Sequence, residues 1–267
     1  MVGVKDIEEI LSIALYTGHI IGEKPVSVML VANVESGKTA LIHRFSQNRD
    51  IVYMQDFTAW GFLNTYGEAL EMGKVKHILI PDFITPLSRA KETVKTLVAF
   101  LNGLIEEGIA EIQTYATRRP LKIGAPNACG LITAIAKGEL EDSRHQWARI
   151  GFLSRVLPVS YEYEGATCVD ILASIARQEY RNNDFIRLHL PDNPWKVHLP
   201  TGIAEKTIPY ALSLSKAEKV YGFRKQKQLQ TLMMGSALAR GNETVDQEDF
   251  DKVVYLSRYV GLEYRKI

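Results

Sequence analysis

The sequence predicts an α/β protein: a three-layer α/β/α core with a mostly parallel five-stranded sheet, followed by a smaller, mainly helical region. Five short apolar runs rich in β-forming residues alternate with helical patterns, as expected for a sheet covered by helices. Each run is apolar on both faces, which suits the interior of a parallel sheet. Beyond Tyr161 helical patterns dominate. The five runs are 27–32, 51–55, 77–81, 130–136 and 156–161.

Apolar residues at helical spacing, together with turn residues, predict the elements around these strands. A helix leads in around residues 7–14, and another spans 88–107, with Ser88 as its N-cap and Gly108 as its stop. Turn-forming residues predict one hairpin over 109–123 and a second over 184–199. We therefore predict a core domain over 1–165 and a helical domain over 166–267 that carries a hairpin insertion. The helices expected in that second domain are 169–180, 203–214, 225–240 and 246–260.

Composition excludes several classes of protein. The 267 residues are 46% apolar and 24% charged, with 32 basic against 31 acidic residues and a net charge of +1. This balance is that of an ordinary globular protein and does not indicate a nucleic-acid or membrane-surface protein. Cys129 and Cys168 lie in no metal-ligand spacing. No signal-peptide pattern or apolar stretch of about 20 residues is present, so we expect a cytoplasmic protein without a membrane span.

The segment Ala32-Asn33-Val34-Glu35-Ser36-Gly37-Lys38-Thr39 matches the GxxxxGK[ST] phosphate-binding pattern between a predicted strand and a predicted helix. Ala32 departs from the pattern, where the first glycine is expected, and can serve if its φ is not positive. Backbone N–H groups of such a loop bind phosphate oxygens. We expect Lys38 to reach the β- and γ-phosphates of ATP and Thr39 to bind Mg²⁺. The expected nucleotide-binding residues are Val34, Glu35, Ser36, Gly37, Lys38, Thr39 and Ala40.

A second acidic position follows the apolar run 77–81. Asp82 at the end of that strand is expected to hold Mg²⁺ through water. Many such proteins place a Glu directly after this Asp to orient the attacking water, and this chain has Phe83 there. Three interpretations follow: hydrolysis is slow or absent, Asp56 at the end of the neighbouring strand supplies the base, or Glu35 approaches the γ-phosphate.

Four downstream segments carry a family resemblance. They are the run 129–134 with Thr133, Leu153-Ser154-Arg155, Tyr221-Gly222-Phe223-Arg224, and the turn 241–250 before the last helix. In order and separation, together with the phosphate loop, they resemble the AAA+ ATPases, closest to the MoxR/MCM-like branch. The resemblance extends over nearly the whole chain. It departs from the family pattern at Val156, where a Phe is expected after the arginine.

The resemblance implies a role for each segment. Thr133 corresponds to the sensor 1 residue near the γ-phosphate, and Arg224 to the sensor 2 arginine of the lid. Arg155 corresponds to the arginine finger that reaches a neighbouring subunit's γ-phosphate, with Arg149 and Arg144 as alternatives. The resemblance further implies a homo-oligomeric ring, usually hexameric, with ATP at the subunit interfaces.

Three functions remain open at this point. The first is an oligomeric ATPase that acts as a motor or remodelling factor on a macromolecule, either DNA or a protein. Arg118 and Arg119, at the turn of the first predicted hairpin, suit contacts with DNA phosphates. The second is a nucleotide-binding scaffold with little hydrolysis, and the third is a RecA-like ATPase that uses Asp56.

Overall fold

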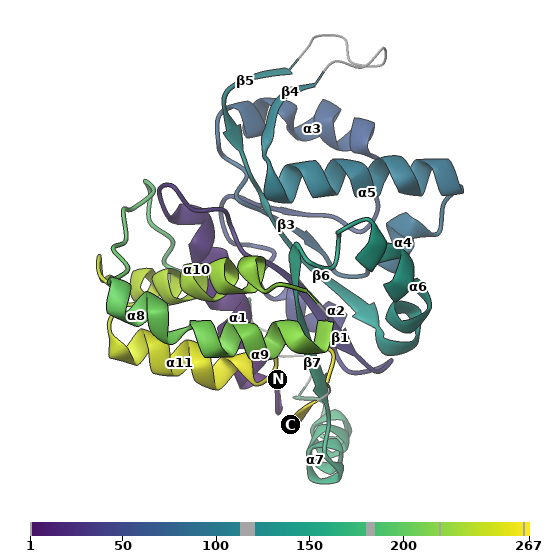
Figure 1. Ribbon diagram of the computed structural model, residues 1–267. Helices are drawn as coiled ribbons and strands as arrows, with labels where there is room; N and C mark the ends of the chain where they lie inside the picture. Colours follow the sequence, from purple (N-terminus) through teal and green to yellow (C-terminus); the bar gives the residue numbers. More distant parts are fainter. Residues whose placement is uncertain (1, 113–120, 180–184, 219, 264) are drawn as a thin grey trace.

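The central sheet has six parallel strands. The computed structural model describes residues 2–112, 121–179, 185–218, 220–263 and 265–267. The strand order is β2-β3-β6-β1-β7-β8, and Figure 1 labels β3, β6, β1 and β7 of this sheet. All five strands expected from the sequence are confirmed, and the sixth is a two-residue edge strand near the C-terminus. Their bounds are β1 Ser27–Ala32, β2 Ile51–Tyr53, β3 His77–Ile80, β6 Gly130–Ala136, β7 Val156–Glu162 and β8 Arg265–Lys266.

Helices cover both faces of this sheet, which gives the three layers expected. Side chains of β1 alternate between the two faces: Val28 and Leu30 join one apolar cluster, and Met29 and Val31 join the other. On the first face lie α1 Lys5–Tyr16, α2 Lys38–His43, α10 Phe223–Ala239 and α11 Gln247–Ser257. On the second face lie α3 Ala59–Glu71, α5 Lys91–Glu106 and α6 Lys137–Arg149. Further helical elements are η1 Thr17–His19, α4 Ile84–Leu87, α8 Thr201–Lys206 and α9 Ile208–Glu218.

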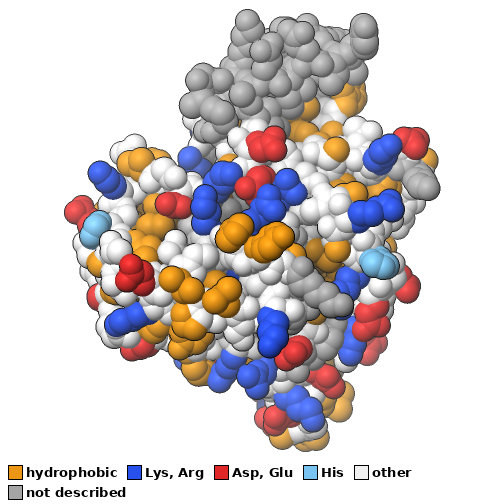
Figure 2. All heavy atoms as spheres, in the orientation of Figure 1, with side chains coloured by type: hydrophobic (Ala, Val, Ile, Leu, Met, Phe, Trp, Pro, Cys, Tyr) orange, Lys and Arg blue, Asp and Glu red, His pale blue; other side chains and the backbone are white. Residues whose placement is uncertain are grey.

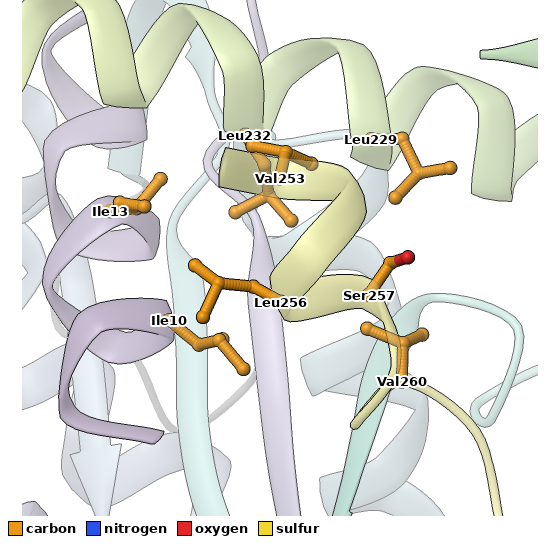
Figure 3. Close-up of a pocket in the computed structure, with 8 residues that line it drawn as sticks. All are labelled: Ile10, Ile13, Leu229, Leu232, Val253, Leu256, Ser257 and Val260. Carbon is orange, nitrogen blue, oxygen red and sulfur yellow. The ribbon is translucent and has the colours of Figure 1, made fainter. Parts of the chain in front are cut away.

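The C-terminal helices share their core with the start of the chain. Helix α10 crosses α1 so closely that a Cβ on Gly235 would lie 2.7 Å from the carbonyl oxygen of Ile13. Apolar side chains of α1, α10 and α11 face one another there (Figure 3) and leave a gap of about 10 Å³, room for about one water. The cluster on this face is therefore continuous from α1 and β1 into α10 and α11. The division at residue 165 stays a prediction.

The first predicted hairpin is confirmed and the second is wrong. Strands β4 (Ile109–Ile112) and β5 (Leu121–Asn127) pair antiparallel, while the turn between them lies outside the described residues. The described residues of the second segment, 185–199, form no strand pair with one another. Trp195 instead bridges to Ile20, and His198 bridges to Thr244. The backbone of this segment pairs with residues after α2 instead of with itself: Ile186 N donates to the carbonyl oxygen of Arg44, and Leu188 N donates to Oδ1 of Asn48.

Helix α7 (Gly165–Ala176) follows β7 and extends from the body of the molecule (Figure 1). None of its residues is buried. Among the described residues, no helix combines the length and the apolar character required to cross a bilayer.

Candidate functional site

The predicted phosphate loop connects β1 to α2, at the carboxyl edge of the sheet. Glu35 and Gly37 adopt left-handed backbone conformations, with φ of 63° and 74°. Ala32 still belongs to β1, where it pairs with Ala136, and it is not among the described residues with positive φ. The departure from glycine at that position is therefore compatible with the turn.

Lys38 folds back over this loop. Its Nζ donates hydrogen bonds to the carbonyl oxygens of Ala32 at 3.0 Å and Asn33 at 2.6 Å, and to Oγ of Ser36 at 3.0 Å. Burial lowers the pKa of Lys38, and the charge of nearby Asp82 partly offsets this effect. The ammonium group thus lies at the loop, where a phosphate oxygen can replace its carbonyl partners.

Two tyrosines, one in β7 and one directly after it, form hydrogen bonds with the loop. The hydroxyls of Tyr161 and Tyr163 both donate to the carbonyl oxygen of Ser36, at 3.1 and 2.8 Å. Burial raises the pKa of both phenols, so they stay protonated donors at neutral pH. The sequence analysis did not identify these residues, although the pattern Tyr-x-Tyr at the end of a strand was a visible signal.

Asp82, which follows β3, lies close to Thr39 of the loop. Thr39 Oγ1 is 3.5 Å from the carbonyl oxygen of Pro81, directly before Asp82. The Asp82 carboxylate also accepts hydrogen bonds from Ile84 N at 3.1 Å and Thr85 Oγ1 at 3.3 Å, so it caps the turn that starts α4. A hydroxyl and one carboxylate fit Mg²⁺, which is commonly held by few protein ligands together with substrate phosphates and water.

An open cavity of about 650 Å³ lies over the loop, within the range of ligand pockets. The cavity is bounded by the loop and by three residues that the sequence analysis did not propose: His43, Tyr53 and Gln55. The Gln55 amide can both donate and accept hydrogen bonds, so it can orient a phosphate or a water.

The two candidates for a water-orienting carboxylate, Glu35 and Asp56, differ in the structure, and Glu35 lines the cavity directly. Asp56 follows β2 and Asp82 follows β3, and because these strands pair in parallel both residues lie at the same edge. Asp56 Oδ2 accepts a hydrogen bond from Arg89 Nη2 at 2.6 Å, so its charge is already paired. The Phe83 side chain instead points into the core.

Phe83 belongs to a cluster of aromatic side chains in the core, close to the carboxyl edge of the sheet. Its ring stacks on Phe152, with centroids 5.3 Å apart, and meets the edge of Trp147 at 5.5 Å. All three side chains are buried. A glutamate side chain in this orientation would be buried among aromatic rings rather than directed at a nucleotide.

Thr133 does not reach the loop, which corrects the sensor 1 expectation. It pairs with Met29, three residues before the end of β1 and so about 10 Å below the edge. Its buried hydroxyl donates to the carbonyl oxygen of Ile80 at 2.8 Å. The hydroxyl is therefore committed to the neighbouring strand. Ala136 is the β6 residue paired with Ala32 at the edge.

Arg155 and Arg224 come together, but at the opposite edge of the sheet. Arg155 directly precedes Val156, which pairs with Ser27 at the start of β1, so the length of β1, about 17 Å, separates it from the phosphate loop. Arg155 Nη1 donates to the carbonyl oxygen of Gly151 at 2.8 Å, and Arg224 Nη1 donates to Ser154 Oγ at 3.1 Å. Neither arginine therefore reaches the phosphate loop of its own chain.

A cavity of about 450 Å³ lies beside these two arginines. Glu106, one of two acidic residues that line it, pairs with Lys24 Nζ at 3.2 Å and with Arg224 Nε at 3.3 Å. Burial acts to raise the pKa of Glu106, but the hydrogen bond and charge of Lys24 and the charge of Arg224 outweigh it, so the pKa is lowered. Basic and acidic side chains gather near the centre of the face in Figure 2.

Comparison with known proteins does not name a family. A scan against protein-family models finds no match, and a search of curated proteins finds none either. The predicted DNA-contacting residues Arg118 and Arg119 lie outside the described residues.

Proposed function

We propose that this chain is an ATP-binding ATPase of the AAA+ type, in which the site held by one copy is completed by a second copy. The single observation that carries the proposal is an open cavity at the carboxyl edge of a parallel sheet that is lined by the phosphate loop, including Lys38 and Thr39, with Asp82 close to both of these residues. Ligands of α/β sheets bind at this edge. Bound ATP with Mg²⁺ would supply the phosphoryl group for transfer to water.

The residues of the loop have separate tasks in this proposal. The N–H groups between Val34 and Ala40 bind the phosphates, and Lys38 exchanges its carbonyl partners for phosphate oxygens. Thr39 and Asp82 hold the metal ion, directly and through water. Tyr161 and Tyr163 keep the loop in its binding conformation through Ser36.

The positions of Arg155 and Arg224 support completion by a second copy. An arginine near the γ-phosphate stabilises the charge of the transition state, and neither arginine reaches the loop of its own chain. We call the sheet edge that carries Arg155 and Arg224 the cationic edge. A head-to-tail arrangement would bring the cationic edge of one copy to the phosphate loop of the next, and repetition of that contact closes a ring or extends a filament.

Complementation between two inactive variants tests this proposal. Arg155→Ala keeps the phosphate loop and loses the finger, while Lys38→Ala keeps the finger and loses phosphate binding. We expect turnover to fall at least about 100-fold in each variant, because an arginine finger contributes about 10³–10⁵ in kcat. Mixing the two variants restores turnover, because the hybrid interface carries both residues.

Controls separate binding from catalysis. Lys38→Ala loses binding of a fluorescent ATP analogue, Arg155→Ala retains it, and Lys74→Ala, at an exposed lysine outside the site, retains both binding and turnover. Unchanged turnover in Arg155→Ala, or a mixture as inactive as its components, contradicts completion by a second copy.

A second function, a nucleotide-dependent scaffold with little hydrolysis, is favoured by one observation. The position directly after Asp82 provides no carboxylate, since Phe83 is buried in its aromatic cluster, and the carboxylate of Asp56 is paired with Arg89. Under this alternative the wild-type chain binds ATP and assembles, but its turnover equals that of Lys38→Ala at every protein concentration. Turnover that is lost in Asp56→Asn while ATP binding is retained would instead assign the base to Asp56. The macromolecule on which the ATPase would act, DNA or a protein, stays a prediction.

A further inference from the structure

Helix α7 presents an apolar stripe to solvent. Val169, Leu172 and Ile175 follow one another at spacings of three, which places them on one face of the helix. Their exposed fractions are 64%, 65% and 50%. Exposed contiguous apolar surface of this kind indicates an interaction site.

A second apolar patch lies beside the cationic edge. Tyr221 and Phe223 are 85% and 75% exposed, and their rings stack on each other at 5.7 Å with an interplanar angle of 13°. Phe223 directly precedes Arg224 at the start of α10. Aromatic residues next to arginines are typical of the residues that dominate protein–protein binding.

We infer that the apolar stripe of α7 in one copy packs on the Tyr221–Phe223 patch of a second copy. The inference rests on the proposed function, because it assigns the surfaces through which two copies meet. The occupant of each patch is thus another molecule of this same chain.

The place of each patch in the fold supports this pairing. Helix α7 starts two residues after Tyr163, whose hydroxyl is bonded to Ser36 of the phosphate loop. The aromatic patch adjoins Arg224, which is bonded to Ser154 beside Arg155. A contact between Arg155 of one copy and the phosphate loop of another brings these patches into the same region. Helix α7 is about 18 Å long, enough to bridge from the loop to the patch.

Charge complementarity favours the same partner. The segment around α7 carries three acidic residues and one basic residue: Glu164, Asp170, Glu179 and Arg177. The cavity next to the aromatic patch is lined by five basic and two acidic residues: Lys24, Arg155, Lys196, Arg224, Lys227, Glu23 and Glu106. Opposite charges on the two surfaces steer the encounter and disfavour pairing of α7 with another α7.

Native Cys168 allows a direct test by crosslinking. It is exposed in the first turn of α7, whereas Cys129 is buried. Wild-type chain is mixed with a size-tagged copy that carries Cys168→Ser and Val220→Cys, since Val220 is exposed next to Tyr221. A short bis-maleimide is expected to join the two copies. A tagged copy with Cys168→Ser and Met72→Cys, at an exposed position at the end of α3, is the matched control and stays uncrosslinked.

A charged residue introduced into the apolar stripe of α7 provides a second test of the inferred contact. Leu172→Asp is expected to raise the protein concentration at which assembly is half complete by at least tenfold, measured by light scattering. Met72→Asp introduces the same charge at an exposed apolar residue at the end of α3 and leaves assembly unchanged.

Several results would overturn the inference. Crosslinks between two Cys168 thiols in the wild-type chain would show pairing of α7 with itself. Flotation of the wild-type chain with anionic phospholipid vesicles, lost in Leu172→Asp, would assign the stripe to a membrane surface. Absence of the Cys168–Val220→Cys crosslink while the Arg155→Ala and Lys38→Ala mixture is active would reject this docking but keep the proposed function. The expected crosslink with an inactive mixture would keep the docking and reject the shared ATPase site.

Discussion

Acidification is expected to destabilise this protein through two buried histidines, His77 and His19. His77 begins β3, the strand that leads to Asp82, and it is packed against Gly130, where a Cβ would lie 2.2 Å from the imidazole ring. Burial lowers the pKa of His77 to about 3, with a further contribution from the charge of His19. Burial likewise lowers the pKa of His19 to about 4, although Asp50, 3.9 Å away, partly opposes it.

The sign and size of the effect follow from proton linkage. The unfolded chain binds protons at these histidines below about pH 6.5, while the folded chain keeps both neutral down to about pH 4. Between those values the unfolded state binds more protons, so the free energy of unfolding falls as the pH falls. From pH 7 to pH 5 each histidine contributes about 2 kcal/mol, or about 4 kcal/mol together. That is a large share of a typical stability of about 5–15 kcal/mol.

Urea unfolding at pH 7, 6 and 5 measures this loss. We expect His77→Gln to halve the drop in unfolding free energy between pH 7 and pH 5, whatever its effect on stability at pH 7. His145→Gln, at an exposed position of α6, serves as the control and keeps the wild-type drop. An equal drop in wild type and His77→Gln would refute the assignment of the pH dependence to this pair.

Two further predictions concern the phosphate loop and the C-terminal helices. Tyr163→Phe removes one of the hydroxyls bonded to the Ser36 carbonyl, and we expect about fivefold weaker binding of an ATP analogue by fluorescence titration, since one hydrogen bond contributes about 1 kcal/mol. Unchanged affinity would show that this bond does not hold the loop. Asp249→Ala removes a fully buried carboxylate paired with Arg240, and we expect a loss of about 3 kcal/mol in thermal unfolding. Glu248→Gln, which changes an exposed partner of the same arginine, is expected to cost under about 1 kcal/mol, and equal losses in the two variants would contradict this reasoning.

Much of the sheet could be predicted because its signal is local. A strand buried on both faces is an uninterrupted apolar run, and β1 and β6 begin and end where their runs do. β8 could not be predicted, because Arg265 and Lys266 form no apolar run and pair with β7 only after the chain has returned to the sheet edge.

The candidate site likewise has one part that a local sequence pattern predicts and another part that only tertiary packing brings together. The phosphate loop is contiguous in sequence, so Lys38 and Thr39 could be placed from the pattern alone. Tyr163 and Gln55 join the loop through strands far apart in sequence, and no local pattern specifies that register. The position of Thr133 within the sheet and the proximity of Arg155 to Arg224 also depend on tertiary packing, so the sequence could not show that Thr133 lies away from the loop.

The close packing of α1 against α10 affects the rate and order in which the chain folds. Residues near the beginning of the sequence find their apolar partners more than 200 positions later, so this face of the sheet is closed by contacts of very long sequence separation. Such contacts slow folding, because a large loop must close before they form. During synthesis the apolar side of α1 waits for α10 and α11 to leave the ribosome, and in that interval it is the surface most exposed to aggregation or to a chaperone.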